Sequence, residues 1–173
     1  MGHREHKHQA PKRVGVALVT VSTSRAAGED RSGPLMAELC AAAGQQVVAR
    51  RLVADGLEPI RAALAELGAD EGVDAVFMSG GSGISSQDLT LEALQPLVRT
   101  WLPGFGELFR RLSFDEIGTP AMLSRAAAAV CLLGSAQRPV LVAALPGSPN
   151  AVRLALEAVL LPELGHLVYE MRR

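Results

Sequence analysis

The sequence predicts a three-layer α/β/α fold with a mostly parallel central sheet. Short valine-rich runs alternate with longer segments in which apolar residues recur at helical spacing. Such alternation is typical of parallel strands joined by helices that cover both faces of a sheet. The 173 residues suit one domain with a substantial core, so we expect a flexible tail at 1–12 and a single domain at 13–173.

The first half of the domain shows the alternation most clearly. Its short apolar runs predict strands at 13–22, 45–54 and 73–79. Helices are expected between them, at 34–44 and 58–70. The first of these helices ends at Gly44, and the second has Pro59 in its first turn. Both residues are common at those positions of a helix.

The second half is less regular. Helical spacing predicts helices at 89–98 and 105–118, separated by a connection at 99–104. Segment 119–134 stays open, because its alanines favour a helix while the run AVCLL favours a strand. A strand at 138–147 and a helix at 148–171 follow, and we expect the helix to break or bend near Pro162.

The overall composition excludes several classes of protein. A formal net charge of −1 gives no basis for binding nucleic acid. No apolar run reaches the roughly 18 residues that span a membrane. Because the polar start does not resemble a signal peptide, we expect a cytoplasmic protein.

Lysine, histidine and cysteine are scarce in the domain. Lys7 and Lys12 are the only lysines, which excludes a Walker-type phosphate loop and Schiff-base chemistry. His166 is the one histidine outside the tail, and we expect it to make a packing or helix-end contact, so a Ser-His-Asp triad is not expected. Cys40 and Cys131 lack metal-ligand spacing and are expected to be buried free thiols.

The fold class alone predicts where a ligand would bind. In open parallel sheets, ligands bind beyond the carboxyl ends of the strands, near a switch in strand order. The loops expected at that edge are 20–33, 54–57, 79–90 and 145–150. Unusual concentrations of glycine, serine and aspartate occur in these loops.

The loop SGGSGISSQDLT has the composition of a phosphate-binding loop. Gly80, Gly81 and Gly83 let several backbone N–H groups approach an anion, and serine hydroxyls add donors. Asp88 would repel a phosphate unless a bound Mg²⁺ lay between them. In the alternative interpretation the loop is only a turn, with Asp88 as the N-cap of the following helix.

Two other motifs match this loop poorly. The run from Gly81 approximates the dinucleotide-binding pattern but ends in Ser86, and no acidic residue for a ribose follows at the required distance. An oxidoreductase that uses a nicotinamide cofactor is therefore not favoured. The nucleophile-elbow pattern fails at Ile84, which stands where its last glycine should be.

Five stretches, in the same order, resemble one known family. TVSTSRAAGEDRSG, SGGSGISSQDLTLEAL, LPGFGELFR, LSFDEIGTPAMLSRA and LPGSPNAVRLALE are similar to segments of the molybdenum cofactor biosynthesis proteins MoaB and MogA and of the related gephyrin domain. The likeness runs from about residue 13 to the C-terminus. The short length and the ending PELGHLVYEM look more like MoaB.

The resemblance implies a function. The family transfers an adenylyl group from ATP to molybdopterin with Mg²⁺, and releases pyrophosphate. Its members have a mostly parallel α/β fold and assemble as trimers or hexamers. Molybdopterin, ATP and copies of the same chain are therefore the expected partners, and other proteins of the pathway are further candidates.

The resemblance also implies the site residues. The family's aspartates match Asp55 and Asp88, which would be catalytic and would hold Mg²⁺. The phosphate- and substrate-binding residues would be Ser22, Ser79, Gly80, Gly81, Ser82, Gly83, Pro146, Gly147, Ser148 and Asn150. For Ser148 an alternative is a helix N-cap, with Pro149 at the first helical position.

The chain departs from the family pattern at several positions of these loops. Ser79 and Ser82 replace threonines and keep the hydroxyl. Gln87 replaces an arginine that commonly precedes the aspartate, and Thr23 replaces an aspartate. The last two changes favour an alternative function, a protein that binds molybdopterin or a nucleotide without catalysis.

The segment TWLPGFGELFRRLSF concentrates large apolar side chains. These residues are Trp101, Leu102, Phe105, Leu108, Phe109, Leu112 and Phe114. They either cover the core at the margin of the sheet or form the contact between subunits of an oligomer.

Overall fold

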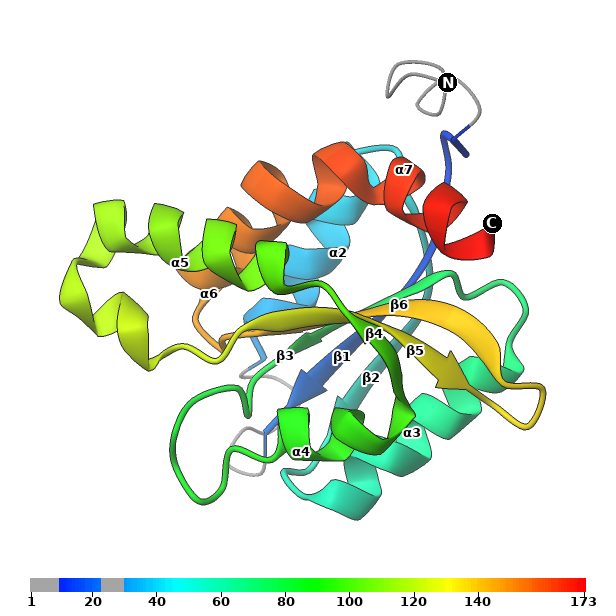
Figure 1. Ribbon diagram of the computed structural model, residues 1–173, viewed down its shortest axis with the longest axis horizontal. Helices are drawn as coiled ribbons and strands as arrows, with labels where there is room; N and C mark the ends of the chain where they lie inside the picture. The colour runs from blue at the N-terminus through cyan, green and yellow to red at the C-terminus, as the bar shows by residue number, and fades with distance from the viewer. Residues whose placement is uncertain (1–9, 23–29) are drawn as a thin grey trace.

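The computed structural model describes residues 10–22 and 30–173, and its centre is a six-stranded sheet (Figure 1). The strands are β1 (Gly15–Val21), β2 (Gln46–Val53), β3 (Ala75–Ser79), β4 (Val98–Trp101), β5 (Ala127–Leu133) and β6 (Arg138–Leu145). Their order is β2-β1-β3-β6-β5-β4. Neighbours pair in parallel from β2 to β6, while β5 is antiparallel to both β6 and β4. The predicted mostly parallel sheet is confirmed.

Helices cover both faces of this sheet (Figure 1). The α-helices are α2 (Ser32–Ala42), α3 (Leu57–Ala69), α4 (Thr90–Leu94), α5 (Pro103–Ile117), α6 (Pro149–Leu154) and α7 (Leu161–Arg172). Among the described residues, the 3₁₀ turns η2 (Gln95–Leu97) and η3 (Thr119–Leu123) follow α4 and α5, and the π-helical turn η4 (Ala155–Leu160) joins α6 to α7. α2, α5, α6 and α7 lie on one face, and α3 and α4 lie on the other.

The core is divided by the sheet into two clusters. Phe77 on β3 packs toward Phe109 of α5 and Leu156 of η4 in the first. Val76 and Met78, the neighbours of Phe77 along the strand, pack toward α3 in the second. Because successive strand side chains point to opposite faces, a strand between two helical layers needs apolar residues at every position. This explains the unbroken apolar runs from which the strands were predicted.

In the second half of the chain, one strand contradicts the sequence prediction and another decides an alternative that the sequence left open. Residues 98–101 form the edge strand β4, so the prediction of helix to residue 98 and a plain connection at 99–104 was wrong. The open segment 119–134 resolves into η3 and the strand β5. Its alanines form a strand because β5 is paired on both sides and is largely buried, which outweighs a weak helical preference.

The last helical region is continuous but changes its winding before Pro162. The N–H of Leu161 donates to the carbonyl of Leu156, five residues earlier, at the end of the π-helical turn. Proline has no N–H and its ring crowds the preceding turn of an α-helix. A wider turn relieves that conflict. The helical region is therefore not broken near Pro162, and its irregularity is this change of winding.

The aromatic segment is divided between the core and the surface. Phe105 and Phe109 stack with ring centroids 6.2 Å apart, and Phe109 is only 1% exposed. Phe114 is 52% exposed, and Trp101 and Leu108 are exposed as well. The interpretation as core cover is confirmed for Phe105 and Phe109, while a subunit contact through the exposed residues stays a prediction.

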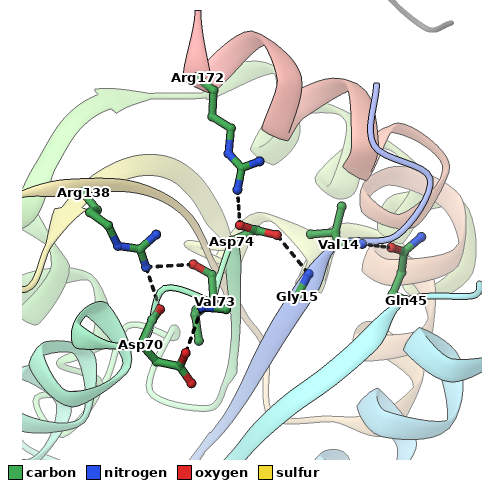
Figure 2. A network of polar contacts seen from close by, with 9 residues as sticks. Val14, Gly15, Gln45, Asp70, Val73, Asp74, Arg138 and Arg172 are labelled. Atoms are coloured by element: carbon green, nitrogen blue, oxygen red, sulfur yellow. Dashed lines mark hydrogen bonds and ion pairs between the residues drawn. The ribbon is translucent and has the colours of Figure 1, made fainter. Parts of the chain in front are cut away.

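At the edge where the parallel strands begin, which we call the amino edge, polar groups are paired (Figure 2). Asp74 accepts the N–H of Gly15 at 3.0 Å and also pairs with Arg172 near the end of α7. Gln45 accepts the N–H of Val14, and Arg138 donates to the carbonyls of Asp70 and Val73. These contacts attach the C-terminal helix and the β5–β6 turn to the starts of β1 and β3.

The prediction of two buried free thiols is confirmed. Cys40 and Cys131 are buried free thiols, and burial raises the pKa of each to about 12. His166 contacts Glu163 and Glu170 on its own helix. Within the described residues, no helix combines the length and the apolar character needed to cross a membrane. Most of the tail and Thr23 lie outside the described residues.

Candidate functional site

A cavity of about 460 Å³ lies at the edge where β1, β2, β3 and β6 end, which we call the carboxyl edge. The strand order reverses here, because β2 lies on one side of β1 and β3 on the other. The cavity is lined by Val21, Ser22, Asp55, Gly80, Gly81, Ser82, Gly83, Asp88, Leu123, Ser124, Pro146 and Gly147. The structure thus places the ligand cavity where the fold class predicts it.

The glycine loop, residues 80–89, is held in an unusual backbone conformation. Gly80 and Gly81 have φ values of 104° and 62°, which side chains disfavour. A Cβ on Gly80 would lie 2.2 Å from the carbonyl oxygen of Val21, and one on Gly81 would lie 2.4 Å from Oγ1 of Thr90. The fold itself therefore requires these two glycines, whatever the loop binds.

Three consecutive N–H groups of this loop are available to a ligand. Within the described residues, the N–H groups of Gly81, Ser82 and Gly83 donate to no protein acceptor, and all three residues line the cavity. We call these groups the N–H cradle. The N–H of Gly80 donates to the carbonyl of Leu145 at 3.0 Å, so it belongs to the sheet and not to the cradle.

Asp88 is not the N-cap of α4. Its Oδ2 accepts the N–H of Ser85 at 2.8 Å, and the helix begins after Leu89 without a side-chain cap. The carboxylate therefore turns back across the glycine loop and lines the cavity. Asp55 reaches the same cavity from the loop between β2 and α3. The two aspartates that the resemblance implied lie on one cavity, 33 positions apart in the sequence.

The loop after β6 contributes backbone more than side chains. Pro146 and Gly147 line the cavity, and the carbonyl of Gly147 accepts the hydroxyl of Ser32 at the start of α2. Ser148 accepts the N–H of Ala151 and is the N-cap of α6, as its alternative interpretation proposed. Ser148 and Asn150 are exposed and do not line the cavity in this structure.

Two further serines implied by the resemblance differ in their surroundings. Ser22 lines the cavity, and its N–H donates to the carbonyl of Val53. Ser79 is 1% exposed, is not part of the cavity lining, and its hydroxyl has no hydrogen-bond partner among the described residues. Gln87 is exposed and its N–H donates to the hydroxyl of Ser85.

Sequence reasoning missed the wall contributed by the segment before β5. Leu123 and Ser124 line the cavity, and Arg125 donates to the carbonyls of Gly83 and Asp88. Because β5 is antiparallel, it begins at the carboxyl edge and brings this segment to the site. The run LSRA was one of the stretches that carried the resemblance, but nothing in its spacing indicates contact with a loop some 40 residues earlier.

The cavity resembles a nucleotide or phosphate site in its chemistry. An N–H cradle suits anionic oxygens, and two carboxylates suit a hard cation that bridges to them. Among the described residues, no group of three or more His, Cys, Asp or Glu side chains could hold a metal ion. Fold and site thus define an α/β protein with a cavity suited to an anionic ligand at the switch in strand order.

Comparison with known proteins identifies the family. A family model described as "Probable molybdopterin binding domain" matches residues 17–166, and the chain belongs to this family. It is 44% identical to molybdenum cofactor biosynthesis protein B of Bacillus cereus, over 100% of this chain and 99% of that protein. It is 37% identical to a molybdopterin adenylyltransferase of Pyrococcus furiosus, over 99% of each.

Solved structures agree with the sequence comparisons. A crystal structure of molybdenum cofactor biosynthesis protein B superimposes with a TM-score of 0.86 and 43% identity, over 95% of this chain and 99% of that one. The resemblance to MoaB and MogA that the sequence motifs indicated is confirmed.

Proposed function

We propose that this protein acts in molybdenum cofactor biosynthesis as a molybdopterin adenylyltransferase. The observation that carries the proposal is one cavity lined by the N–H cradle, Asp55 and Asp88. The related Pyrococcus protein that bears this activity in its name matches the chain over nearly its full length. Among the described residues no lysine or histidine lines the cavity, and the transfer proposed here needs neither as a base.

The reaction needs positioning more than proton transfer. A phosphate oxygen of molybdopterin attacks the α-phosphorus of ATP, the bond from that phosphorus to its bridging oxygen breaks, and pyrophosphate leaves with the electron pair. The attacking phosphate is already ionised at neutral pH, so the site has to align the reactants and offset their charge. In our proposal the N–H cradle holds the nucleotide phosphates, while Ser22 and the backbone of Pro146 and Gly147 contact the other substrate.

Mg²⁺ fits the residues of the cavity. Oδ2 of Asp88 accepts the Ser85 N–H, while Asp88 and Asp55 both line the cavity. Mg²⁺ usually binds one or two carboxylates together with substrate phosphates and waters, so a cage made only of protein ligands is not needed. When bound, it would neutralise charge on the phosphates, with Asp88 and Asp55 as its protein ligands or partners of its waters.

The direct test is pyrophosphate release from ATP with and without purified molybdopterin, across a titration of Mg²⁺. We expect release that requires both molybdopterin and Mg²⁺. Binding of ATP or molybdopterin without pyrophosphate release would instead support the non-catalytic alternative suggested by Gln87 and Thr23. The cytoplasmic location stays a prediction from the sequence.

We also propose that the chain assembles as a trimer or as a hexamer of two trimers. Exposed apolar side chains gather on α5 and η3, where Phe114 is 52% and Met122 is 77% exposed. α5 and η3 pack against each other, and an apolar patch of sufficient area usually marks a contact. Light scattering should give three or six times the chain mass, and Phe114→Asp should lower it.

The control for this experiment is Leu52→Asp, which changes an exposed apolar residue on β2, the edge strand farthest from β4 and β5, and should leave the mass unchanged. Phe109 is unsuitable as a test position because it is part of the core of its own chain. A monomer mass for the unmodified protein would contradict the proposal.

A further inference from the structure

The directions of the three N–H bonds of the cradle depend on how the carbonyls of the same peptide units are held. Each N–H of the cradle belongs to a peptide unit whose carbonyl lies on the preceding residue: Gly80, Gly81 or Ser82. In a planar trans peptide the C=O and N–H bonds point in opposite directions. Anchoring those three carbonyls therefore aims the three N–H groups.

All three carbonyls are anchored in the structure. Thr90 supplies two of the donors: its hydroxyl donates to the carbonyl of Gly80 at 2.8 Å, and its N–H donates to that of Gly81 at 3.0 Å. The backbone N–H of Arg125 donates to the carbonyl of Ser82 at 3.1 Å. Thr90 is fully buried, so its hydroxyl is committed to this contact.

The Arg125 side chain extends the same support to the rest of the loop. Its Nε donates to the carbonyl of Gly83 at 2.6 Å, and one terminal nitrogen donates to the carbonyl of Asp88 at 2.8 Å. Glu92 on α4 orients the guanidinium with contacts of 2.6 and 3.4 Å. Asp88 is thus held at its carbonyl by Arg125 and at its carboxylate by the N–H of Ser85.

We infer that Thr90 and Arg125 are positioning residues that aim the N–H cradle and Asp88 at a nucleoside triphosphate. Neither side chain lines the cavity, so both act through the glycine loop. The inference rests on the proposed adenylyl transfer for its substrate, while the geometry that it describes exists without a ligand. The hydrogen bond from Arg125 lowers the pKa of Glu92. The ion pair between them therefore persists at neutral pH, and it is lost only when the pH falls through that lowered pKa.

The kinetic test compares matched variants. Thr90→Val removes the hydroxyl but keeps the shape of the side chain, and Thr90→Ser restores the hydroxyl. We expect Thr90→Val and Arg125→Gln to raise the KM for ATP about tenfold and to lower kcat/KM by about 10²-fold, because small misplacements in a phosphate site have effects of this size. Thr90→Ser should stay within about twofold of the unmodified protein.

Arg138→Gln is the control for Arg125→Gln. Arg138 also donates to two backbone carbonyls, those of Asp70 and Val73, but at the amino edge. Arg138→Gln should lower the melting temperature about as much as Arg125→Gln does, and it should leave the KM for ATP unchanged. A wild-type KM in Thr90→Val, or an equal rise of KM in Arg138→Gln, would overturn the inference.

A second measurement separates this inference from the proposed function. NMR order parameters of the Gly81, Ser82 and Gly83 amides in the ligand-free protein should fall in Thr90→Val and Arg125→Gln but not in Thr90→Ser or Arg138→Gln. Unchanged order parameters would overturn the inference even if the enzyme is active. Failure of the unmodified protein to release pyrophosphate would overturn the proposed function, and the order parameters would still decide the inference.

Discussion

The two edges of the sheet differ in the acceptors that are available to their backbone N–H groups. At the amino edge, the N–H groups of Val14 and Gly15 find side-chain acceptors in Gln45 and Asp74 (Figure 2). At the carboxyl edge, the N–H groups of the cradle find no protein acceptor within the described residues. Ser82, in the middle of the cradle, is nonetheless only 3% exposed.

The difference shows which of the two edges contributes more hydrogen bonding to the stability of the fold. A buried polar group left without a partner costs roughly 1–3 kcal/mol, whereas a typical satisfied hydrogen bond contributes about 1 kcal/mol. The hydrogen bonds at the amino edge make such contributions, and they also attach the C-terminal helix α7 to the sheet. At the carboxyl edge the three N–H groups of the cradle make no such contribution within the described residues, and they are the groups that a phosphate would satisfy. Changes at the two edges should therefore have different consequences.

Asp88→Asn should have the largest effect on activity. Asparagine can still accept the N–H of Ser85, so the loop should keep its shape while losing the charge that holds Mg²⁺. Pyrophosphate release at limiting Mg²⁺ should fall on the order of 10²-fold. Asp70→Asn is the control at the amino edge, because Asp70 likewise accepts a nearby N–H, that of Gly72. A wild-type rate in Asp88→Asn would contradict the role of Asp88.

Gly81→Val should damage both the stability and the ATP affinity. Valine at a φ of 62° costs about 1–2 kcal/mol, and its Cβ would also collide with Thr90. Gly44→Val provides the control, because Gly44 has a φ of 76° but nothing within 4 Å of an added Cβ. Urea denaturation should show the larger loss for Gly81→Val, and calorimetry should show weaker ATP binding only there. Equal ATP affinity in both variants would mean that the loop is only a turn.

Asp74→Ala should affect stability alone. It removes the acceptor for the N–H of Gly15 and the partner of Arg172, at a side chain that is 15% exposed. The free energy of unfolding should fall by about 1–3 kcal/mol. The rate of pyrophosphate release at a temperature well below the melting transition should not change. A parallel fall in rate would show that the two edges are coupled.

Gln87→Arg should have the smallest effect. The side chain is exposed at the glycine loop, so an arginine could reach a bound phosphate only through solvent-screened attraction. We expect ATP to bind at most about fivefold more tightly at low salt, and the gain to disappear at high salt. Gln46→Arg, on an exposed residue at the start of β2, should change nothing. No gain in Gln87→Arg would indicate that position 87 points away from the ligand.

Much of the fold and part of the site could be predicted from the sequence. The buried strands β1, β3 and β6 correspond to apolar runs in the sequence. The carboxyl ends of these predicted strands indicate the position of the cavity without the help of any motif. The edge strand β4 was missed because four residues, three of them exposed, carry no periodic signal. Asp88 was indicated by the composition of its own loop, whereas Asp55 was found only through the family resemblance, since spacing alone does not bring two loops together.

The support behind the glycine loop could not be predicted. Arg125 lies 42 positions from Gly83 and 37 from Asp88, and it reaches them only because β5 runs antiparallel. Three glycines in one loop are typical of anion binding, yet Gly80 and Gly81 are already required by contacts with Val21 and Thr90. Composition could not separate these two causes, because both act on the same backbone.

The antiparallel pairing of β4 and β5 gives the fold a natural place for insertions. β4 ends and β5 begins at the carboxyl edge, so the intervening residues 102–126 leave the sheet and return to it on the same side (Figure 1). Lengthening such an excursion costs little closure entropy and leaves every strand register unchanged. New surface could therefore be added beside the cavity without rebuilding the core, and relatives that differ in partners should differ in length here first.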